Sequence, residues 1–125
     1  MDNGRGENKV KELSFAFALR VVKLCRFLEQ EQREYVISKQ LLKSGTAIGA
    51  LVREAEHAES RADFIHKMTI ALKEANETLY WIELLYHSQL LDQKGFDSIN
   101  PDIVELLKLL TAIVKASKKK RLDTC

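Results

Sequence analysis

The fold is decided by residues 37–82, which read ISKQLLKSGTAIGALVREAEHAESRADFIHKMTIALKEANETLYWI. Apolar and small residues recur there every three to four positions, in two sets that each form one face of a helix. The first set is Ile37, Leu41, Ser44, Ile48, Val52 and Ala55, and the second is Phe64, Met68, Ala71, Leu72, Ala75, Leu79 and Ile82. Between the sets, Ser60 and Asp63 have the spacing of a capping box with a shorter acid. The stretch therefore predicts two helices, over about 35–58 and 61–90, joined by a short turn.

Two glycines, Gly45 and Gly49, lie in the middle of the first of these helices, within a run of small residues. A glycine in a helix interior costs up to about 1 kcal/mol, so its presence needs a compensating reason. We expect another backbone to approach closely at this point. An interruption of the helix here is the alternative.

Upstream, apolar residues dominate the segment 12–29 and predict another helix. Its thin polar strip consists of Arg20, Lys23 and Arg26. Ser14 is a candidate N-cap because its side chain can accept a hydrogen bond from the first helical turn. A charged break over 30–34 separates this helix from the next.

Downstream, a connection over 92–101 ends in Asn100 and Pro101, which open a last helix. Its core face consists of Ile103, Leu106, Leu107, Leu110, Ile113 and Val114. Short connections make consecutive helices antiparallel neighbours. The sequence therefore predicts an all-α fold, an antiparallel up-down-up-down four-helix bundle. The expected segments are a disordered N-terminus over 1–10, the bundle over 11–118 and a basic tail over 119–125.

The net charge of +2 is unevenly placed along the 125 residues. Five basic residues lie near the C-terminus with no acid between them: Lys115, Lys118, Lys119, Lys120 and Arg121. Removing these five charges from +2 leaves the rest of the chain at −3. One hypothesis is that the tail binds the phosphates of RNA or DNA, with the effect multiplied in an oligomer. The alternative is a solvated helix end.

Two helices carry more apolar surface than a bundle core needs, which is about three positions in seven. The helix over 12–29 is apolar on nearly all sides, and the helix over 61–90 has a second stripe beside its core face. That stripe consists of Lys67, Ile70, Glu74, Thr78, Trp81 and Leu85. Because surplus apolar width is typical of burial against a partner, we expect a homo-oligomer; a deep core is the alternative. The expected contact residues are Phe15, Leu19, Val22, Ile70, Glu74 and Trp81.

No set of residues has the pattern of an active site, so we expect neither an enzyme nor a cofactor. Glu54 with His57, and Asp63 with His66, have the acid-x-x-His spacing of di-iron bundles. Such a site needs two further inward carboxylates, and both histidines lie half a helical turn from the core faces. We therefore expect no metal, and a small metalloprotein is the weaker alternative. The aromatic residues Tyr80, Trp81 and Tyr86 either stack on bases or pack in a core or interface.

The two cysteines do not form a disulfide framework. Cys25 lies among apolar residues, where a thiol behaves as a small buried hydrophobe, and Cys125 is the last residue. Residues 1–7 contain no apolar signal-peptide core, and no apolar run approaches the roughly 20 residues that span a bilayer. These features predict a cytoplasmic protein without a membrane partner.

The middle of the chain, over about 39–85, combines many small and charged residues at fixed spacing. They are Ser44, Gly45, Thr46, Ile48, Gly49, Arg53, Glu54, Ala55, Ala58, Ser60, Asp63, Phe64, Ile65, Lys67, Leu72, Lys73, Glu74, Ala75, Glu77, Tyr80 and Trp81. With this combination the chain resembles the four-helix bundle family of bacterial 23S rRNA intervening-sequence proteins. The family is named for reading frames inside some large-subunit ribosomal RNA genes, and accessory proteins of diversity-generating retroelements are related to it.

The resemblance implies an antiparallel four-helix bundle that assembles as a ring, with a pentamer as the expected size, and a role with nucleic acid. The family offers no catalytic residue to carry over. Two departures stand out: the retroelement relatives are strongly basic and this chain is not, and Leu51 occupies a position where the family commonly has Asn. We therefore expect a non-enzymatic, self-assembling scaffold or binding module, with RNA or DNA binding by the tail as the alternative.

Overall fold

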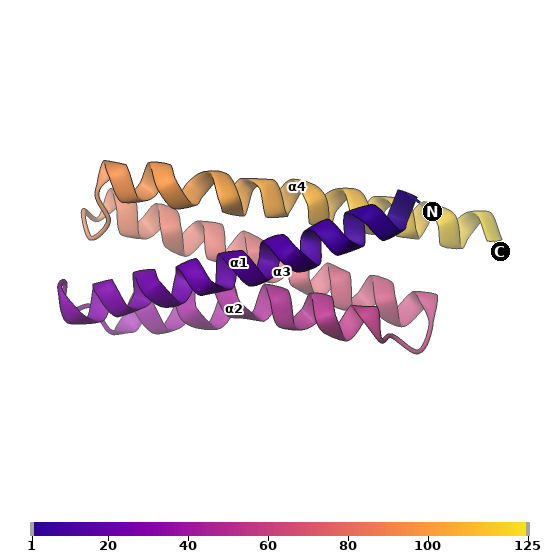
Figure 1. Ribbon diagram of the computed structural model, residues 1–125, viewed down its shortest axis with the longest axis horizontal. Helices are drawn as coiled ribbons and strands as arrows, with labels where there is room; N and C mark the ends of the chain where they lie inside the picture. The colour runs from indigo at the N-terminus through magenta and orange to yellow at the C-terminus, as the bar shows by residue number, and fades with distance from the viewer. Residues whose placement is uncertain (1, 125) are drawn as a thin grey trace.

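The computed structural model describes residues 2–124, without the side chains of residues 2–4, 121, 123 and 124. Four helices follow one another: α1 (Asp2–Gln30), α2 (Val36–Glu56), α3 (Arg61–His87) and α4 (Gln93–Thr124). They lie side by side and alternate in direction (Figure 1). The α1–α2 and α3–α4 connections lie at one end, and the α2–α3 connection lies at the other end with both termini (Figure 1). The described residues contain no strand, so the predicted all-α, up-down-up-down bundle is confirmed.

Each helix packs against its neighbours along the chain, and α1 also packs against α4, which closes the bundle. All four helices contribute large side chains to one continuous core. The largest fully buried members include Phe17 and Leu28 of α1, Leu41 and Ile48 of α2, Met68 and Ile82 of α3, and Ile103, Leu106 and Leu110 of α4. Burial of this apolar surface is the main favourable term in folding.

Gly45 of α2 allows Val21 of α1 to approach closely, and the α1 backbone passes Gly49 at an ordinary contact distance. A Cβ atom placed on Gly45 would lie 2.9 Å from both Cγ atoms of Val21. One placed on Gly49 would lie 3.5 Å from the backbone oxygen of Ser14. The helix continues without a break through this region. The prediction of a close backbone approach is confirmed, and the alternative of an interrupted helix is wrong.

The turn between α2 and α3 is fixed by a reciprocal cap. The Asp63 backbone N–H donates to Ser60 Oγ (3.0 Å), and Asp63 Oδ2 accepts from the Glu59 N–H (3.2 Å). The first bond satisfies a backbone donor of the first helical turn, and the second satisfies the N–H of the residue that precedes the N-cap. The predicted start of this helix at Ser60 is confirmed.

The first helix begins earlier than the sequence indicates. We expected disorder over 1–10 and an N-cap at Ser14, but α1 runs from Asp2 and Ser14 is buried inside it. The Ser14 hydroxyl donates to the Lys11 carbonyl (3.2 Å) instead of capping. The physical reason is tertiary packing: Val10 is fully buried, and a Cβ on Gly6 would lie 3.9 Å from Ile113 of α4.

The last helix also exceeds its expected bounds at both ends. It begins at Gln93, because Asp92 Oδ1 accepts from the Gly95 N–H (2.8 Å) in the manner of an N-cap. Pro101, which we expected near the helix start, lies inside α4. At the other end α4 continues to Thr124. Residues 119–124, which we expected to belong to a separate tail, are therefore part of this helix. Cys125 lies outside the described residues.

Candidate interaction surfaces

The outer side of α1 carries an apolar stripe, which we call the α1 stripe: Phe15, Leu19 and Val22. These residues are spaced i, i+4 and i+7, so they share one side of the helix. Phe15 is 51% exposed and Leu19 53% exposed, while Val22 is half-buried. The guanidinium of Arg53 from α2 lies over the Phe15 ring, with Cζ 5.1 Å from the ring centroid. The stripe therefore runs along the edge that α1 shares with α2.

A second surface, the α3 stripe, consists of Ile70, Glu74 and Trp81, and all three are half-buried. Trp81 Nε1 donates to Glu77 Oε2 (3.2 Å), which fixes the outer edge of the indole. The Tyr80 ring meets the Trp81 ring edge-on, with centroids 4.9 Å apart. This aromatic pair lies at the helix surface, since Tyr80 is 56% exposed.

Two residues that we assigned to this second stripe belong to the core instead. Thr78 and Leu85 are fully buried. The Thr78 and Ser44 hydroxyl oxygens share a hydrogen bond of 2.9 Å across the α2–α3 interface, and Thr78 Oγ1 also lies 2.7 Å from the Glu74 carbonyl oxygen. Because its hydroxyl is satisfied in this way, a threonine is tolerated at a buried position.

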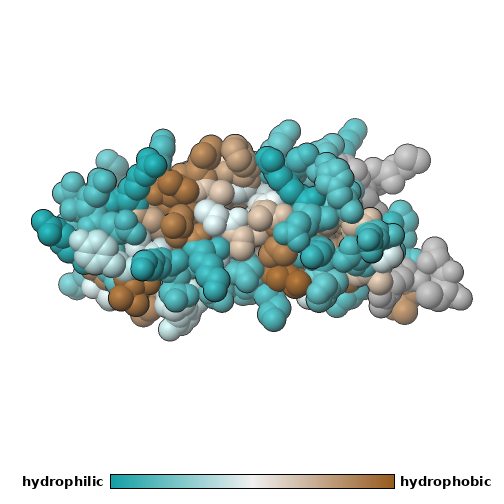
Figure 2. All heavy atoms as spheres, turned by 90° about the horizontal axis from the view of Figure 1, so that it is seen from below, coloured by the Kyte–Doolittle hydropathy of each residue, from teal (hydrophilic) through white to brown (hydrophobic). Residues whose placement is uncertain are grey.

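The two stripes lie on opposite sides of α2. Consecutive residues of that helix show the arrangement, because Arg53 contacts Phe15 of α1 whereas Glu54 accepts from Lys67 Nζ of α3 (3.0 Å). The six predicted contact residues therefore form two separate patches. Figure 2 views the side of the bundle that α2 occupies and shows apolar and neutral side chains gathered along its middle, between strongly polar ends.

The predicted phosphate-binding residues lie on the last turns of α4. Lys115, Lys118, Lys119 and Lys120 are all exposed, whereas the side chain of Arg121 lies outside the described part of the structure. Lys115, Lys118 and Lys119 are spaced i, i+3 and i+4, which places them on one side of the helix. Ser117, between them, is buried on the opposite side.

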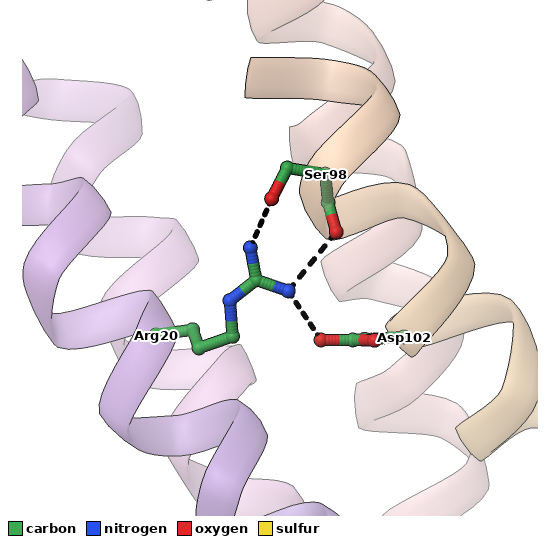
Figure 3. A network of polar contacts seen from close by, with 3 residues as sticks. All are labelled: Arg20, Ser98 and Asp102. Atoms are coloured by element: carbon green, nitrogen blue, oxygen red, sulfur yellow. Dashed lines mark hydrogen bonds and ion pairs between the residues drawn. The ribbon is translucent and has the colours of Figure 1, made fainter. Parts of the chain in front are cut away.

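The edge between α1 and α4 is held by a polar clamp (Figure 3). Arg20 of α1 donates through Nη1 to Asp102 Oδ2 (2.5 Å) and to the Ser98 carbonyl oxygen (2.9 Å). Its Nη2 donates to the Ser98 hydroxyl. One guanidinium thus bridges two turns of α4, a geometry to which its forked donors are suited.

A cavity of about 310 Å³ lies near the end of the bundle where the α2–α3 connection is found. Its lining includes Val10, Val52 and Met68, with Glu7 and Glu56 among its polar residues. Glu56 is already paired, because its Oε1 lies 2.8 Å from Lys11 Nζ. The hydrogen bond from Lys11 lowers the pKa of Glu56 below its ordinary value.

The acid and histidine pairs that resemble di-iron ligands are engaged elsewhere or exposed. Glu54 pairs with Lys67, Asp63 caps α3, and both His57 and His66 are exposed. Among the side chains that the structure describes, no three from His, Cys, Asp or Glu lie close enough to hold a metal ion. Burial raises the pKa of the Cys25 thiol, which does not favour a nucleophilic thiolate.

None of the helices in the described part of the chain has an apolar stretch long enough to cross a membrane.

Residues 6–112 match the family described as 23S rRNA-intervening sequence protein. A solved structure from Bacteroides thetaiotaomicron, a protein with unknown function from the S23 ribosomal protein family, is 55% identical to the chain. The alignment covers 88% of this chain and 98% of that chain, with a TM-score of 0.86. No curated protein matches the sequence.

Proposed function

Because the chain belongs to the family of 23S rRNA-intervening sequence proteins, we propose that it acts as a non-enzymatic, self-assembling scaffold or binding module. The assembly is a homo-oligomer in the form of a ring, and five is the number of subunits that the sequence resemblance implies. The bundle supplies rigid surfaces, and the oligomer repeats each surface around its axis. Such repetition raises the avidity of a weak contact without any new interaction.

The observation that carries this proposal is the exposure of Phe15 and Leu19 side by side on α1. Large apolar side chains that are adjacent and half-exposed are typical of surfaces that become buried against a partner. The α3 stripe supports it, because Trp81 is the kind of residue that dominates the binding energy of interfaces. Both stripes belong to helices whose inner faces already fill the core.

The experiment compares two double substitutions to aspartate. Light scattering on a sizing column measures the molar mass of each variant. Phe15→Asp with Leu19→Asp is expected to give a folded protein with the mass of one chain. The matched control is Tyr35→Asp with Val36→Asp, which places the same charges on exposed apolar residues outside both stripes. The control is expected to keep the mass of the wild type. Loss of assembly in both variants, or in neither, would contradict the assignment of the α1 stripe to the interface.

A second candidate function is binding of RNA or DNA through Lys115, Lys118, Lys119, Lys120 and Arg121. The observation that favours it is the helical continuation of α4, which holds three exposed lysines on one side. Phosphate contacts of this kind release counterions, so affinity falls steeply with salt. A ring would bring several such helix ends together.

Fluorescence anisotropy with labelled single-stranded and duplex oligonucleotides, titrated across salt concentration, tests this candidate. Replacing the four described lysines with glutamine is expected to reduce both the affinity and its dependence on salt. The control replaces four exposed lysines elsewhere, Lys9, Lys39, Lys43 and Lys94. Absence of binding at low salt, or equal effects of the two variants, would remove this function.

We also place the protein in the cytoplasm. The support is the unpaired, buried thiol of Cys25, which lies 3.3 Å from the Ser38 carbonyl oxygen. Unpaired cysteines are the usual state in reducing compartments. Fractionation of cells that express the full chain checks this placement, and recovery outside the cytoplasmic fraction would contradict it.

A further inference from the structure

The α1 stripe has positive charge at both of its ends. Arg26 continues the stripe one turn beyond Val22 and is exposed. Arg53 lies over Phe15 at the other end. Neither arginine forms an ion pair with an acid among the described residues, where the cations in ion pairs are Lys11, Arg20 and Lys67. The stretch of α1 from Leu13 to Leu28 contains no Asp or Glu.

The α3 stripe has the opposite charge. Glu74 is part of the stripe, and the exposed Glu77 accepts the hydrogen bond of Trp81. No basic side chain of the described residues is paired with either glutamate. Lys67, at the beginning of this side of α3, is already neutralised by Glu54 at 3.0 Å. The stripe therefore contains one carboxylate without an ion pair, Glu74, and a second, Glu77, lies beside it.

When Arg26 is added to the α1 stripe, the two surfaces have the same length. From Phe15 to Arg26 and from Ile70 to Trp81 the helices advance by the same number of residues, about 16 Å along each axis. Over that length the α1 stripe is apolar between its charged ends, and the α3 stripe has Ile70 and Trp81 near its ends with Glu74 between them. Opposite charges across an interface favour the unlike partner over the like one.

We propose that the α1 stripe of one subunit packs on the α3 stripe of the next, with Arg26 and Arg53 facing Glu74 and Glu77. This inference rests on the self-assembly proposed above and specifies its geometry. Packing α1 on α1 would bring arginines together, and packing α3 on α3 would bring glutamates together; like charges across an interface are costly. Pairing unlike stripes makes the interface heterologous, which gives a ring when the rotation closes.

The position of the stripes agrees with this geometry. They lie on opposite sides of α2, so one subunit can use both at once without overlap. An interface between two identical surfaces would stop at a dimer, with the other stripe left in water. The unlike pairing covers both stripes of every subunit in a closed ring.

The test is charge reversal in the full chain, with the mass of the assembly measured by sedimentation velocity over a range of protein concentrations. Arg26→Glu with Arg53→Glu, and separately Glu74→Arg with Glu77→Arg, are each expected to raise the dissociation constant at least about tenfold. Combining all four substitutions in one chain restores opposite charges and is expected to restore assembly. Mixing the two double variants is expected to restore association between unlike chains, with at most four of the five interfaces of a ring complementary in charge, and this keeps the test valid if the fourfold variant folds poorly.

Two controls reverse the same charges away from the stripes: Lys39→Glu with Lys94→Glu, and Glu31→Lys with Glu83→Lys, all at exposed positions. They are expected to assemble like the wild type. If the wild type itself is a monomer, both the proposed function and this inference are wrong. If the wild type assembles but neither the fourfold variant nor the mixture recovers, only the pairing of α1 with α3 is overturned.

Discussion

The two faces of α1 are alike in composition and differ in what they meet. On the inner face, Phe17 and Val21 are fully buried against the other helices. On the outer face, Phe15 and Leu19 stay about half-exposed in the single chain. The apolar side chains on both faces favour burial away from water. Only one face of a helix can point into its own bundle, so the bundle covers the inner face and leaves the outer face exposed. The inner face therefore controls folding, and we propose that the outer face controls assembly.

The largest expected effect comes from truncating one phenylalanine on each face. Phe17→Ala leaves a cavity in the core and is expected to lower the free energy of unfolding by about 3–5 kcal/mol. Phe15→Ala removes an exposed ring and is expected to change the stability of the isolated subunit by about 0.5 kcal/mol or less. Urea unfolding over a range of protein concentrations measures both. Equal decreases in the free energy of unfolding would show that the two faces of α1 contribute equally to folding.

A smaller effect is expected where the inner face meets α2. In Gly45→Val the new side chain overlaps Val21, whose Cγ atoms would lie 2.9 Å from a Cβ, so we expect a loss of about 1–3 kcal/mol. Gly49→Ala is the matched control, because its Cβ meets Ser14 at an ordinary 3.5 Å. Adding Val21→Ala to Gly45→Val is expected to recover part of the loss in thermal unfolding. No recovery would mean that the close approach is not the cause.

A weaker contribution is expected from the third side of α1, which faces α4. Arg20→Ala removes the clamp to Ser98 and Asp102, and its partly exposed position limits the expected loss to about 1 kcal/mol. A double-mutant cycle with Asp102→Ala measures the coupling between the two charges. Coupling of zero at low salt would show that the clamp does not join the helices.

The smallest effect is a pH dependence at the N-terminal end of α1. Lys11 lowers the pKa of Glu56, so the folded state releases the proton of this carboxyl more readily than the unfolded state does. The stabilisation by the pair is therefore present above the ordinary Glu pKa of about 4.3 and is lost as pH falls through the lowered value. The difference in Tm between wild type and Lys11→Met is expected to vanish in that acidic range. A difference that persists there would contradict the pairing.

The helices were predictable because their core positions follow the helical period without interruption. The Ser60 cap was also predictable, because a capping residue stabilises the first helical turn. The close approach at Gly45 and Gly49 was predictable because glycine destabilises a helix interior and therefore indicates a packing reason. The early start of α1 was not predictable, because residues 2–10 have almost no apolar period and are helical through contact with the far end of α4. The start of α4 had a signal that we did not use, the N-cap residue Asp92.

The surfaces were predictable only in part. Surplus apolar width identified Phe15 and Leu19 correctly as exposed, because a helix has only one side for its own core. The same reasoning misplaced Thr78, because a hydroxyl enters a core only with a partner, and Ser44 lies on another helix. That the stripes occupy opposite sides of α2, and that their charges are opposite and unneutralised, follows from the assembled bundle and not from any one segment.

Sedimentation equilibrium of the wild-type chain over a dilution series measures whether the subunits assemble through the outer face of α1. We expect a mass that is a multiple of one chain at micromolar concentration, falling toward one chain only on strong dilution. We also expect Leu19→Asp to shift this transition to higher concentration while the helical content stays unchanged. A folded wild type with the mass of a single chain at every concentration would show that the outer face of α1 needs no partner.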